Sequence, residues 1–211
     1  MYSHKNGVTF RKADSADLPF LQEMKGENWW GTRSVAIIND YDQRKWFDNL
    51  PGNCLVLIGQ ISVRGEIISQ QYVGYCIISE IDWIARIASI SGAVHERMRS
   101  PEKSRQAFEA GLDFAFEMLN MHRLDAEVAE YHYPASKIEI DALGFKVEGL
   151  KKQSIYKCGR YYNSLMLGML RSDWENHPRV KTMGGSCCTN FDHHKANIMI
   201  NRANREQSIN I

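Results

Sequence analysis

A cluster of basic side chains surrounds a predicted helix start near the middle of the chain. Residues 100–102 read Ser-Pro-Glu, a pattern in which proline suits the first helical position. A helix N-terminus presents unpaired N–H groups and a partial positive charge, and both favour a bound phosphate. The segment therefore predicts a local anion site, whose charge comes from four neighbouring residues: Arg97, Arg99, Lys103 and Arg105.

Two adjacent tryptophans, Trp29 and Trp30, fall in a loop that is predicted between two helices. Flat aromatic rings in a loop can clasp a sugar, a base or the end of a peptide. They can equally form a lid over the hydrophobic core. The sequence leaves both interpretations open.

The C-terminal region holds metal-ligating residue types in a spacing that does not suit a metal. Cys187 and Cys188 are adjacent, as are His193 and His194, whereas the ligands of a tetrahedral site usually have two or more residues between them. We therefore expect no metal. The odd total of five cysteines is typical of reduced thiols rather than of a disulfide framework, which favours a cytoplasmic location.

Length and composition indicate one globular domain with a polar tail. The chain has 211 residues, of which 44% are hydrophobic and 24% charged, and its formal net charge is +1. That balance excludes nucleic-acid or membrane binding driven by bulk charge, so an anion site must be local. The sequence has no apolar run of the roughly 18 residues that span a bilayer, and its N-terminus does not read as a signal peptide. We expect a domain over residues 1–178 and a polar tail or docking arm over residues 179–211.

The apolar periodicity predicts a mixed order of elements, β-α-α-β-β-β-α-β-α-β-β. One long helix crosses between two strands, so the sheet should be mostly antiparallel with a parallel pair at this crossover. The expected strands cover residues 8–12, 54–63, 71–79, 83–95, 123–129, 145–156 and 161–170. The expected helices cover residues 14–27, 40–50, 100–121 and 134–143.

The long helix is expected to bury one stripe of small and apolar side chains. Such residues recur at positions i, i+3, i+4 and i+7, which is the spacing of one helix face. The predicted inward stripe is Ala107, Ala110, Gly111, Phe114, Ala115 and Met118.

Several phrases follow one another in an order that is specific when taken together. Residues 106–128, QAFEAGLDFAFEMLNMHRLDAEV, contain most of the predicted long helix, a Leu-His-Arg-Leu-like phrase at its end, and the start of the next strand. Residues 143–149 contain a Gly-Phe-x-x-Glu-Gly phrase, and residues 154–175 read as a terminal hairpin with a Trp-Glu ending. Residues 9–17 and 86–94 add an opening strand and a fourth strand. In this order and spacing the chain resembles the GNAT superfamily of N-acetyltransferases, in particular the branch that contains the ribosomal-protein N-terminal acetyltransferases.

The similarity covers about residues 8–175 and implies a GNAT fold. This is an α/β fold with a mixed, mostly antiparallel sheet of about seven strands and helices on both faces. Its fourth and fifth strands splay apart, and the pantetheine arm of coenzyme A lies in the opening. The resemblance therefore implies acetyl-CoA as a co-substrate, with the helix after the fourth strand as the cradle for its phosphates.

The chain departs from the family at the phosphate-binding loop. Relatives usually carry small or flexible residues, often glycine, where this chain has Ser100, Glu102 and Ser104. Glycine allows close approach of the backbone to phosphate, whereas Glu102 adds a side chain and a negative charge. We expect the amides of residues 103–106 to face a phosphate without any glycine. The expected cofactor-binding residues are Ala93, Val94, His95, Arg99, Ser100, Lys103, Ser104 and Arg105.

Acetyl transfer needs an oxyanion donor and an acid for the leaving thiolate. By resemblance the oxyanion donor is a backbone N–H within residues 93–95, with Val94 as the central expectation. Relatives use as acid a tyrosine, whose position is Ile140 here, or a serine, whose position is Ser136. Ser136 can equally be a capping residue of its helix. Tyr133 stands where relatives often place a cofactor-contacting asparagine, and it offers a second hydroxyl.

A primary amine is protonated at neutral pH, so transfer also needs a base. Some relatives carry a glutamate on the sixth strand, but Ile155 occupies that position. Glu96 and His95 end the fourth predicted strand, close to the expected cleft. A carboxylate at a strand end is more often solvated than catalytic, and a water chain would also serve, so the sequence assigns no base. Besides this candidate base, the residues expected at the acceptor site are Trp29, Trp30 and Glu80.

These expectations converge on an acyl-CoA-dependent N-acyltransferase that moves an acetyl group from acetyl-CoA to a primary amine by direct attack. The acceptor is a protein N-terminus, an amino sugar or another small amine, and analogy with the ribosomal-protein branch favours the first. The alternative is a GNAT-derived binding or regulatory module without transfer activity, which the missing loop glycines, tyrosine and glutamate support. A third hypothesis is a homo-oligomer in which the tail docks on a neighbour.

Overall fold

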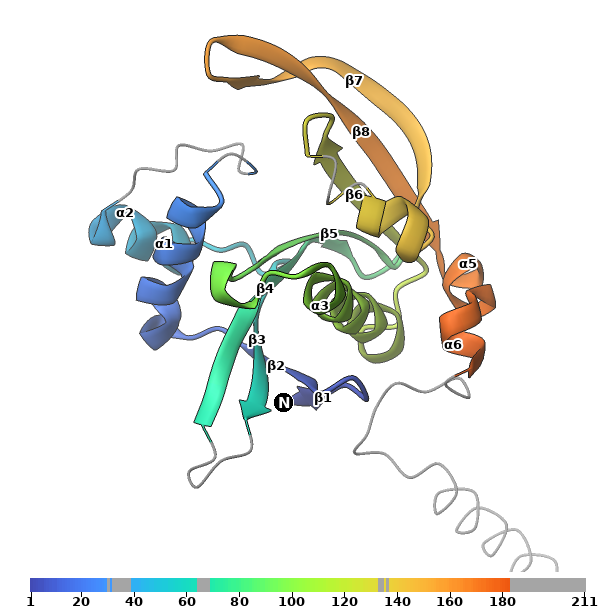
Figure 1. Cartoon of the computed structure of the whole chain (residues 1–211), viewed down its shortest axis with the longest axis horizontal. Helices are drawn as coiled ribbons and strands as arrows, with labels where there is room; N and C mark the ends of the chain where they lie inside the picture. The colour runs from blue at the N-terminus through green and yellow to red at the C-terminus, as the bar shows by residue number, and fades with distance from the viewer. Residues whose placement is uncertain (30, 32–38, 64–68, 133–134, 136, 183–211) are drawn as a thin grey trace, which may run out of the picture.

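The protein forms one eight-stranded sheet with helices on both faces (Figure 1). The computed structural model describes residues 1–29, 31, 39–63, 69–132, 135 and 137–182. The strand order is β1-β2-β3-β4-β5-β6-β8-β7, and neighbouring strands are antiparallel except for β5 and β6. The mixed, mostly antiparallel sheet of the prediction is thus confirmed, with one short N-terminal strand more than expected. The strands are β1 (Tyr2–Ser3), β2 (Val8–Lys12), β3 (Leu55–Val63), β4 (Ser69–Asp82), β5 (Ile87–Val94), β6 (Arg123–Ala129), β7 (Lys146–Lys157) and β8 (Arg160–Leu170).

The parallel pair β5–β6 opens the sheet. Only the start of each strand is paired, from Ile87 opposite Arg123 to Ser89 opposite Asp125. Beyond this pairing β5 continues to Val94 and β6 continues to Ala129. The two strands therefore separate, as the predicted splay requires, and their unpaired edges face an opening that other elements must line.

The helices lie on both faces because the strands alternate their side chains. On β3, Leu57 packs into the cluster that contains α3, whereas Val56 and Ile58 pack with Phe20 and Met24 of α1 on the other face. Figure 1 shows α1 and α2 together, apart from α3. The α-helices are α1 (Leu18–Glu27), α2 (Asp40–Asp48), α3 (Pro101–Asp113), α5 (Arg171–Asn176) and α6 (Pro178–Thr182).

A π-helical segment, Phe114–Met118, corrects the predicted inward stripe of the long helix. Its wider turn is visible in the bond from the Leu119 N–H to the carbonyl oxygen of Phe114, 3.3 Å long. The extra residue in the turn shifts the following side chains around the axis. Phe116 is therefore fully buried, whereas Met118, predicted to face inward, is 54% exposed.

The packed domain extends past the boundary predicted at residue 178. Val180 is only 3% exposed, and the Arg179 guanidinium donates to both carboxylate oxygens of Asp113 in α3. Residues 183–211, which make up most of the predicted tail and contain its cysteine and histidine pairs, lie outside the described residues. Among the described helices, none is long and apolar enough to cross a membrane.

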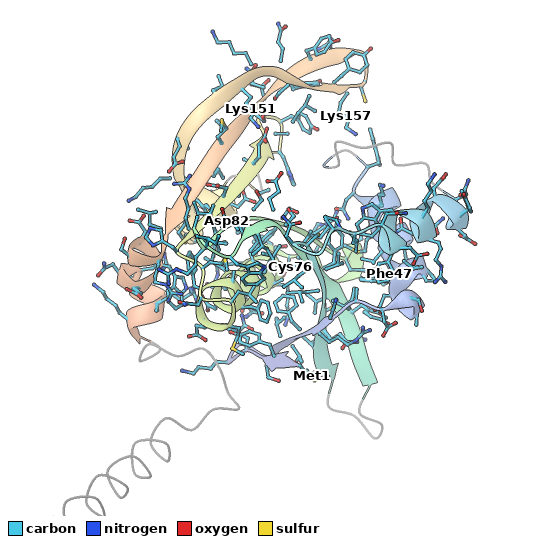
Figure 2. All side chains as sticks on the ribbon, turned by 180° about the vertical axis from the view of Figure 1, so that it is seen from behind. Met1, Phe47, Cys76, Asp82, Lys151 and Lys157 are labelled. Atoms are coloured by element: carbon cyan, nitrogen blue, oxygen red, sulfur yellow. The ribbon has the colours of Figure 1, made fainter. Side chains whose placement is uncertain are left out.

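The β7–β8 hairpin projects beyond the neighbouring strands (Figure 1). Lys151 and Lys157 of β7 lie on this projection, whereas Cys76 of β4 lies within the body of the molecule (Figure 2). Lys157 donates to the carbonyl oxygen of Trp29 at 2.8 Å. Lys151 donates to a carboxylate oxygen of Glu127 on β6 at 2.9 Å. These two bonds tie the hairpin to the segment after α1 and to the open edge of β6.

Candidate active site

Two cavities meet at the splay between β5 and β6. The larger, of about 780 Å³, lies between β5, the start of α3 and the helical segment that ends with Ile138–Ala142. The smaller, of about 430 Å³, extends toward β6 and α1. Both cavities are lined by Gly92 and Ala93, so each opens toward the unpaired edge of β5. The residues that line both cavities are Asn28, Gly92, Ala93, Phe108, His132 and Ala135.

The larger cavity contains most of the expected cofactor-binding residues. His95 and Lys103 are outside its lining, and Lys103 is exposed. The remaining wall is largely apolar, with Phe108, Ala135 and Ile138 among its residues. A long, slender ligand with charged and apolar parts fits this combination of walls. The expected cofactor-binding residues that line the larger cavity are Ala93, Val94, Arg99, Ser100, Ser104 and Arg105.

The backbone of β5 directs the Val94 amide into the opening. The His95 N–H donates to the carbonyl oxygen of Val73 on β4 at 2.7 Å. Amides of successive residues in a strand point to opposite edges, so the Val94 N–H points away from β4, toward the splay. β5 has no pairing with β6 at this residue. Val94, the central expectation for the oxyanion donor, therefore has the required direction, whereas the His95 amide is already used within the sheet.

The start of α3 is a capped helix end rather than an open amide cradle. The Ser100 side chain accepts from the Lys103 N–H at 3.2 Å, and the Ser104 N–H donates to the Ser100 carbonyl oxygen at 2.9 Å. Pro101 has no N–H, and later amides of a helix bond to carbonyl groups one turn back. The amides of Lys103 and Ser104 are therefore already bonded within the helix start, and the expectation that the amides of residues 103–106 face a phosphate stays a prediction.

The basic side chains that line the larger cavity are instead the guanidinium groups of Arg99 and Arg105 and the amine of Lys137. Arg99 donates to Asn28 Oδ1 at 2.9 Å and to the Val94 carbonyl oxygen at 3.1 Å. Arg105 pairs with Glu109, one turn further along α3. A guanidinium has five N–H donors, so each of these side chains keeps donors for a phosphate oxygen.

The smaller cavity carries acidic and aromatic side chains that the sequence did not single out. Glu127 of β6 uses one carboxylate oxygen to accept from Lys151 at 2.9 Å and the other to accept from Ser164. Tyr75 and Lys25 also line the cavity. Burial raises the pKa of the Tyr75 hydroxyl above its ordinary value, so the group stays protonated.

Glu139 is the second carboxylate of the smaller cavity, and its environment differs from that of Glu127. Its Oε2 atom is buried and has no hydrogen-bond partner among the described residues. Burial raises the pKa of this carboxyl group to about 7. The available sequence signal was a single acid between two isoleucines, Ile138 and Ile140, in a helix that must pack on the sheet.

His132 lies where the two cavities meet. Burial, and then the positive charge of Arg99, lower the pKa of its imidazole to about 4. The side chain is therefore neutral at physiological pH. A neutral imidazole with so low a pKa is a weak base for an ammonium group.

Of the other residues expected at the acceptor site or as its base, the described ones, Glu80, Glu96 and Trp29, do not line either cavity. Glu80 is exposed and accepts from the Ser89 hydroxyl at 2.8 Å on the far part of β4. Glu96 is also exposed, and its backbone N–H donates to Glu27 at 3.2 Å. Trp29 is 47% exposed, and Trp30 lies outside the described residues. The roles of all four residues stay predictions.

Two expected catalytic residues, Ser136 and Tyr133, also lie outside the described residues. The chain neighbours of Ser136 are described, and both Ala135 and Lys137 line the larger cavity. Its role as an acid stays a prediction.

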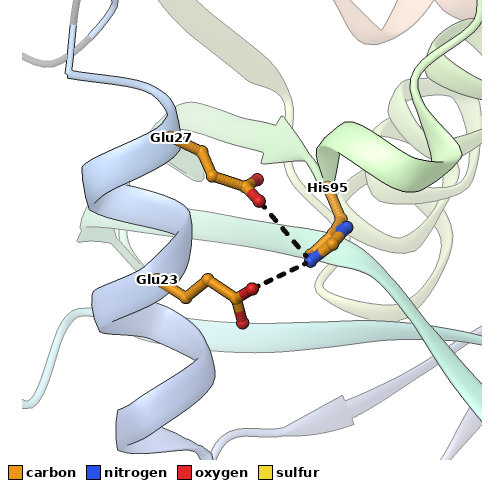
Figure 3. A group of neighbouring side chains, drawn as sticks. All are labelled: Glu23, Glu27 and His95. Atoms are coloured by element: carbon orange, nitrogen blue, oxygen red, sulfur yellow. Dashed lines mark ion pairs between the residues drawn. The ribbon is translucent and has the colours of Figure 1, made fainter.

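His95 points toward α1 rather than into the larger cavity (Figure 3). Its Nε2 atom lies 3.7 Å from a carboxylate oxygen of Glu23 and 3.7 Å from one of Glu27. These three side chains have the residue types of a metal site. However, Nδ1 accepts from the Arg97 N–H at 3.2 Å, so Nε2 carries the proton and faces the carboxylates as a donor. The cluster thus joins the end of β5 to α1 by charge-assisted contacts.

Residues 63–166 match the family model described as an acetyltransferase (GNAT) domain. This stretch runs from the end of β3 into β8 and contains both cavities' shared residues on β5, α3 and the segment after β6. The splayed sheet and the sequence match agree, so the chain has the GNAT fold.

Solved structures of the same fold include a spermidine N-acetyltransferase from Vibrio cholerae in complex with CoA and spermine. It is 18% identical to this chain, with a TM-score of 0.72, and the match covers 82% of this chain and 100% of the other. A spermidine/spermine N-acetyltransferase from the same organism, in complex with manganese ions, is 18% identical with a TM-score of 0.68 and covers 82% and 98% of the two chains. At this identity the likeness shows the fold. No curated protein sequence matches the chain significantly.

Proposed function

We propose that the protein is an acyl-CoA-dependent N-acetyltransferase that moves an acetyl group from acetyl-CoA to a primary amine by direct attack. The observation that carries the proposal is the meeting of two different cavities at Gly92 and Ala93 of β5. The larger cavity has Arg99 and Arg105 and a mainly apolar wall, beside the two acids Glu102 and Asp141. The smaller cavity has the carboxylates Glu127 and Glu139. This is the arrangement that a polyanionic thioester and a cationic amine need when they approach the same point from two sides.

In this proposal the chain's own residues position and polarise the reacting groups. Arg99 and Arg105 bind phosphate oxygens, and the apolar wall around Phe108 binds the pantetheine arm. The Val94 N–H, which points into the splay, donates to the thioester carbonyl oxygen and stabilises the negative charge that develops there. Ser136 remains the candidate that gives a proton to the leaving thiolate. Acetyl-CoA, when bound, supplies the activated acyl group.

The acceptor that these side chains favour is a cationic small amine. Glu127 and Glu139 line the smaller cavity, which is the acceptor-side cavity in this proposal. Carboxylates in a confined site attract ammonium groups. Polyamines have this chemistry, and the titles of the solved structures with the same fold name spermidine and spermine. A protein N-terminus, suggested by the ribosomal-protein resemblance, is the competing acceptor. Parallel assays with spermidine, glucosamine and a short peptide distinguish them.

The first test is the binding of acetyl-CoA to the full chain by calorimetry. Arg105→Gln should weaken binding about tenfold, because it removes a charge-assisted contact worth about 1.5 kcal/mol. Lys103→Gln is the matched control, since it removes the same charge from an exposed neighbour outside the cavity lining. It should weaken binding by less than threefold, roughly the effect of a screened surface charge.

Two results would count against the enzyme. Equal losses in the two variants would show that the cavity does not hold the phosphates. Tight binding together with no free thiol released from acetyl-CoA in the presence of any amine would favour the alternative, a GNAT-derived binding or regulatory module. The capped helix start and the missing loop glycines are the features that support that alternative.

A further inference from the structure

We propose that Glu139 is the general base of the transfer, accepting the proton that the acceptor's ammonium group must lose before it attacks the thioester. This role deepens the proposed acetyl transfer and rests on it. The sequence assigned no base, and the structure places the expected candidates Glu80 and Glu96 outside both cavities.

The position of Glu139 suits this role. Glu139 lines the acceptor-side cavity and is absent from the lining of the larger cavity, which is the cofactor-side cavity in the proposal. It also borders a small apolar cleft beside Ser91 of β5 and Ala126 of β6, so the side chain lies at the splay itself. The acceptor-side cavity is lined both by Glu139 and by Ser91, Gly92 and Ala93 of β5, so an amine bound there would have both on its walls.

The buried oxygen of Glu139 is an acceptor without a donor. The carboxylates buried elsewhere in the described residues, Asp17, Glu109 and Asp113, each accept from an arginine. Glu139 Oε2 has no hydrogen-bond partner among the described residues. Leaving a buried acceptor unpaired costs stability, so its retention in a cavity indicates a ligand that brings the donor. An acceptor ammonium group has three N–H donors and a matching charge.

The other titratable groups that face the cavity are less suited to the task. Both oxygens of Glu127 already accept, from Lys151 and from Ser164. Lys25 is a cationic residue type, which repels an ammonium group, and burial raises the pKa of the Tyr75 hydroxyl, so this group does not take up a proton. His132 has an imidazole whose pKa burial lowers to about 4. The raised pKa of Glu139, about 7, is close to the pH at which proton transfer must occur, which is where a general base is most effective.

Glu139, as a carboxylate, takes one proton from the ammonium group, directly or through one water, and becomes a carboxylic acid. The freed lone pair forms the C–N bond to the thioester carbonyl carbon, and the C–S bond breaks as the oxyanion collapses. One of the two protons left on nitrogen is transferred to the coenzyme A thiolate. Glu139 then loses its proton to solvent, so the net reaction releases one proton.

The test is Glu139→Gln in the full chain, because glutamine keeps the shape and removes the basic group. We expect kcat with spermidine to fall at least about 100-fold, the usual contribution of a general base, while acetyl-CoA affinity measured by calorimetry stays within twofold. In the wild-type protein kcat should rise with pH through a limb near 7, and this limb should be lost in Glu139→Gln. Glu127→Gln, a carboxylate of the same cavity, should retain the limb.

A second readout does not depend on turnover. With ¹³C-labelled glutamate, one carboxyl resonance should titrate near pH 7 and should disappear in Glu139→Gln. Wild-type transfer together with an unchanged limb in Glu139→Gln, or the absence of a resonance that titrates near pH 7, would overturn the inference and leave the proposed function standing. An absence of transfer by the wild-type protein to every amine would refute the proposed function and the inference together.

Discussion

Asp113 and Glu139 are two acids of the same domain that have buried carboxylate oxygens in opposite surroundings. Asp113, at the end of α3, accepts from His4 at 2.8 Å, from the Trp174 indole at 2.6 Å and from both terminal nitrogens of Arg179. Glu139, on the segment after β6, has a buried oxygen with no partner among the described residues. The first arrangement uses a charge to hold the fold together. The second leaves a charge site unsatisfied where a ligand would bind, which is how binding and catalytic sites differ from structural ones.

The location of Asp113 explains why its pairing is complete. It joins the loop after β1, helix α3, helix α5 and helix α6, four parts that are distant in the sequence. Each partner brings at least one N–H, and the carboxylate itself is fully buried. A site with these contacts cannot exchange protons or ligands without opening the packing of the C-terminal helices.

Removing the Asp113 carboxylate is the largest perturbation that we expect. Asp113→Ala leaves the Arg179 charge and the Trp174 N–H buried without their acceptor, so the free energy of unfolding should fall by about 3–5 kcal/mol. Asp48→Ala, at the exposed end of α2, is the control and should change it by about 0.5 kcal/mol or less. Urea unfolding of the three proteins measures the difference. Equal stabilities would show that Asp113 contributes nothing beyond an exposed acid.

Glu139 should have the opposite effect on stability, and the effect should depend on pH. Its pKa in the folded protein is about 7, above the ordinary value of 4.5, so the folded state keeps a proton that the unfolded chain loses first. The free energy of unfolding should therefore fall between pH 4.5 and 7, by about 3 kcal/mol in total. Glu139→Gln removes this loss, so the variant should gain stability relative to the wild-type protein as pH rises through this window.

His132 makes a difference measurement necessary. Its pKa is lowered from 6.5 to about 4 in the folded protein, so it contributes a slope of the opposite sign, with stability rising as pH increases from 4 to 6.5. The stability of Glu139→Gln minus that of the wild-type protein, followed by urea unfolding at several pH values, isolates the carboxyl group. His132→Asn should give a difference curve of opposite slope. A flat curve for Glu139→Gln would place its folded pKa near the ordinary value and remove the contrast with Asp113.

The elements of the fold were predictable because their signals are local. β2 and β6 have the predicted bounds, and α1 ends at Glu27 as expected. The π-helical turn after α3 could not be predicted from local signals. It buries Phe116, whose ring stacks on that of Trp174 with ring centroids 5.2 Å apart. No local pattern encodes that contact, so the predicted inward position of Met118 was wrong.

The candidate site divides in the same way. Arg99, Ser100 and Arg105 could be predicted because a helix start with basic neighbours is a short motif, and they line the larger cavity. Glu127 and Glu139 could not, since they come from a strand and a helix that meet only when the sheet opens at β5. A buried acid acquires its chemistry from the side chains around it, and those are set by tertiary packing.

The smallest predicted effect concerns a hydrogen-bond donor, the Lys103 N–H, which the fold satisfies as it satisfies the Asp113 carboxylate. Ser100 satisfies the Lys103 N–H inside the cofactor-side cavity, as Arg179 satisfies Asp113. Ser100→Ala should lower the free energy of unfolding by about 1 kcal/mol, the usual cost of a lost N-cap. It also frees the amide for a phosphate oxygen, so acetyl-CoA affinity measured by calorimetry should hold or rise by a few fold, the worth of one hydrogen bond.

Asn39→Ala is the matched control, because Asn39 caps α2 in the same way, accepting from the Asp42 N–H at 2.8 Å. It should cost similar stability and leave acetyl-CoA affinity unchanged, since it does not line either cavity. A tenfold loss of affinity in Ser100→Ala alone would mean that the Ser100 hydroxyl itself contacts the ligand. The helix start would then bind acetyl-CoA in its capped form. The Ser100 hydroxyl would contact the ligand, and the Lys103 N–H would stay bonded within the helix rather than to a phosphate.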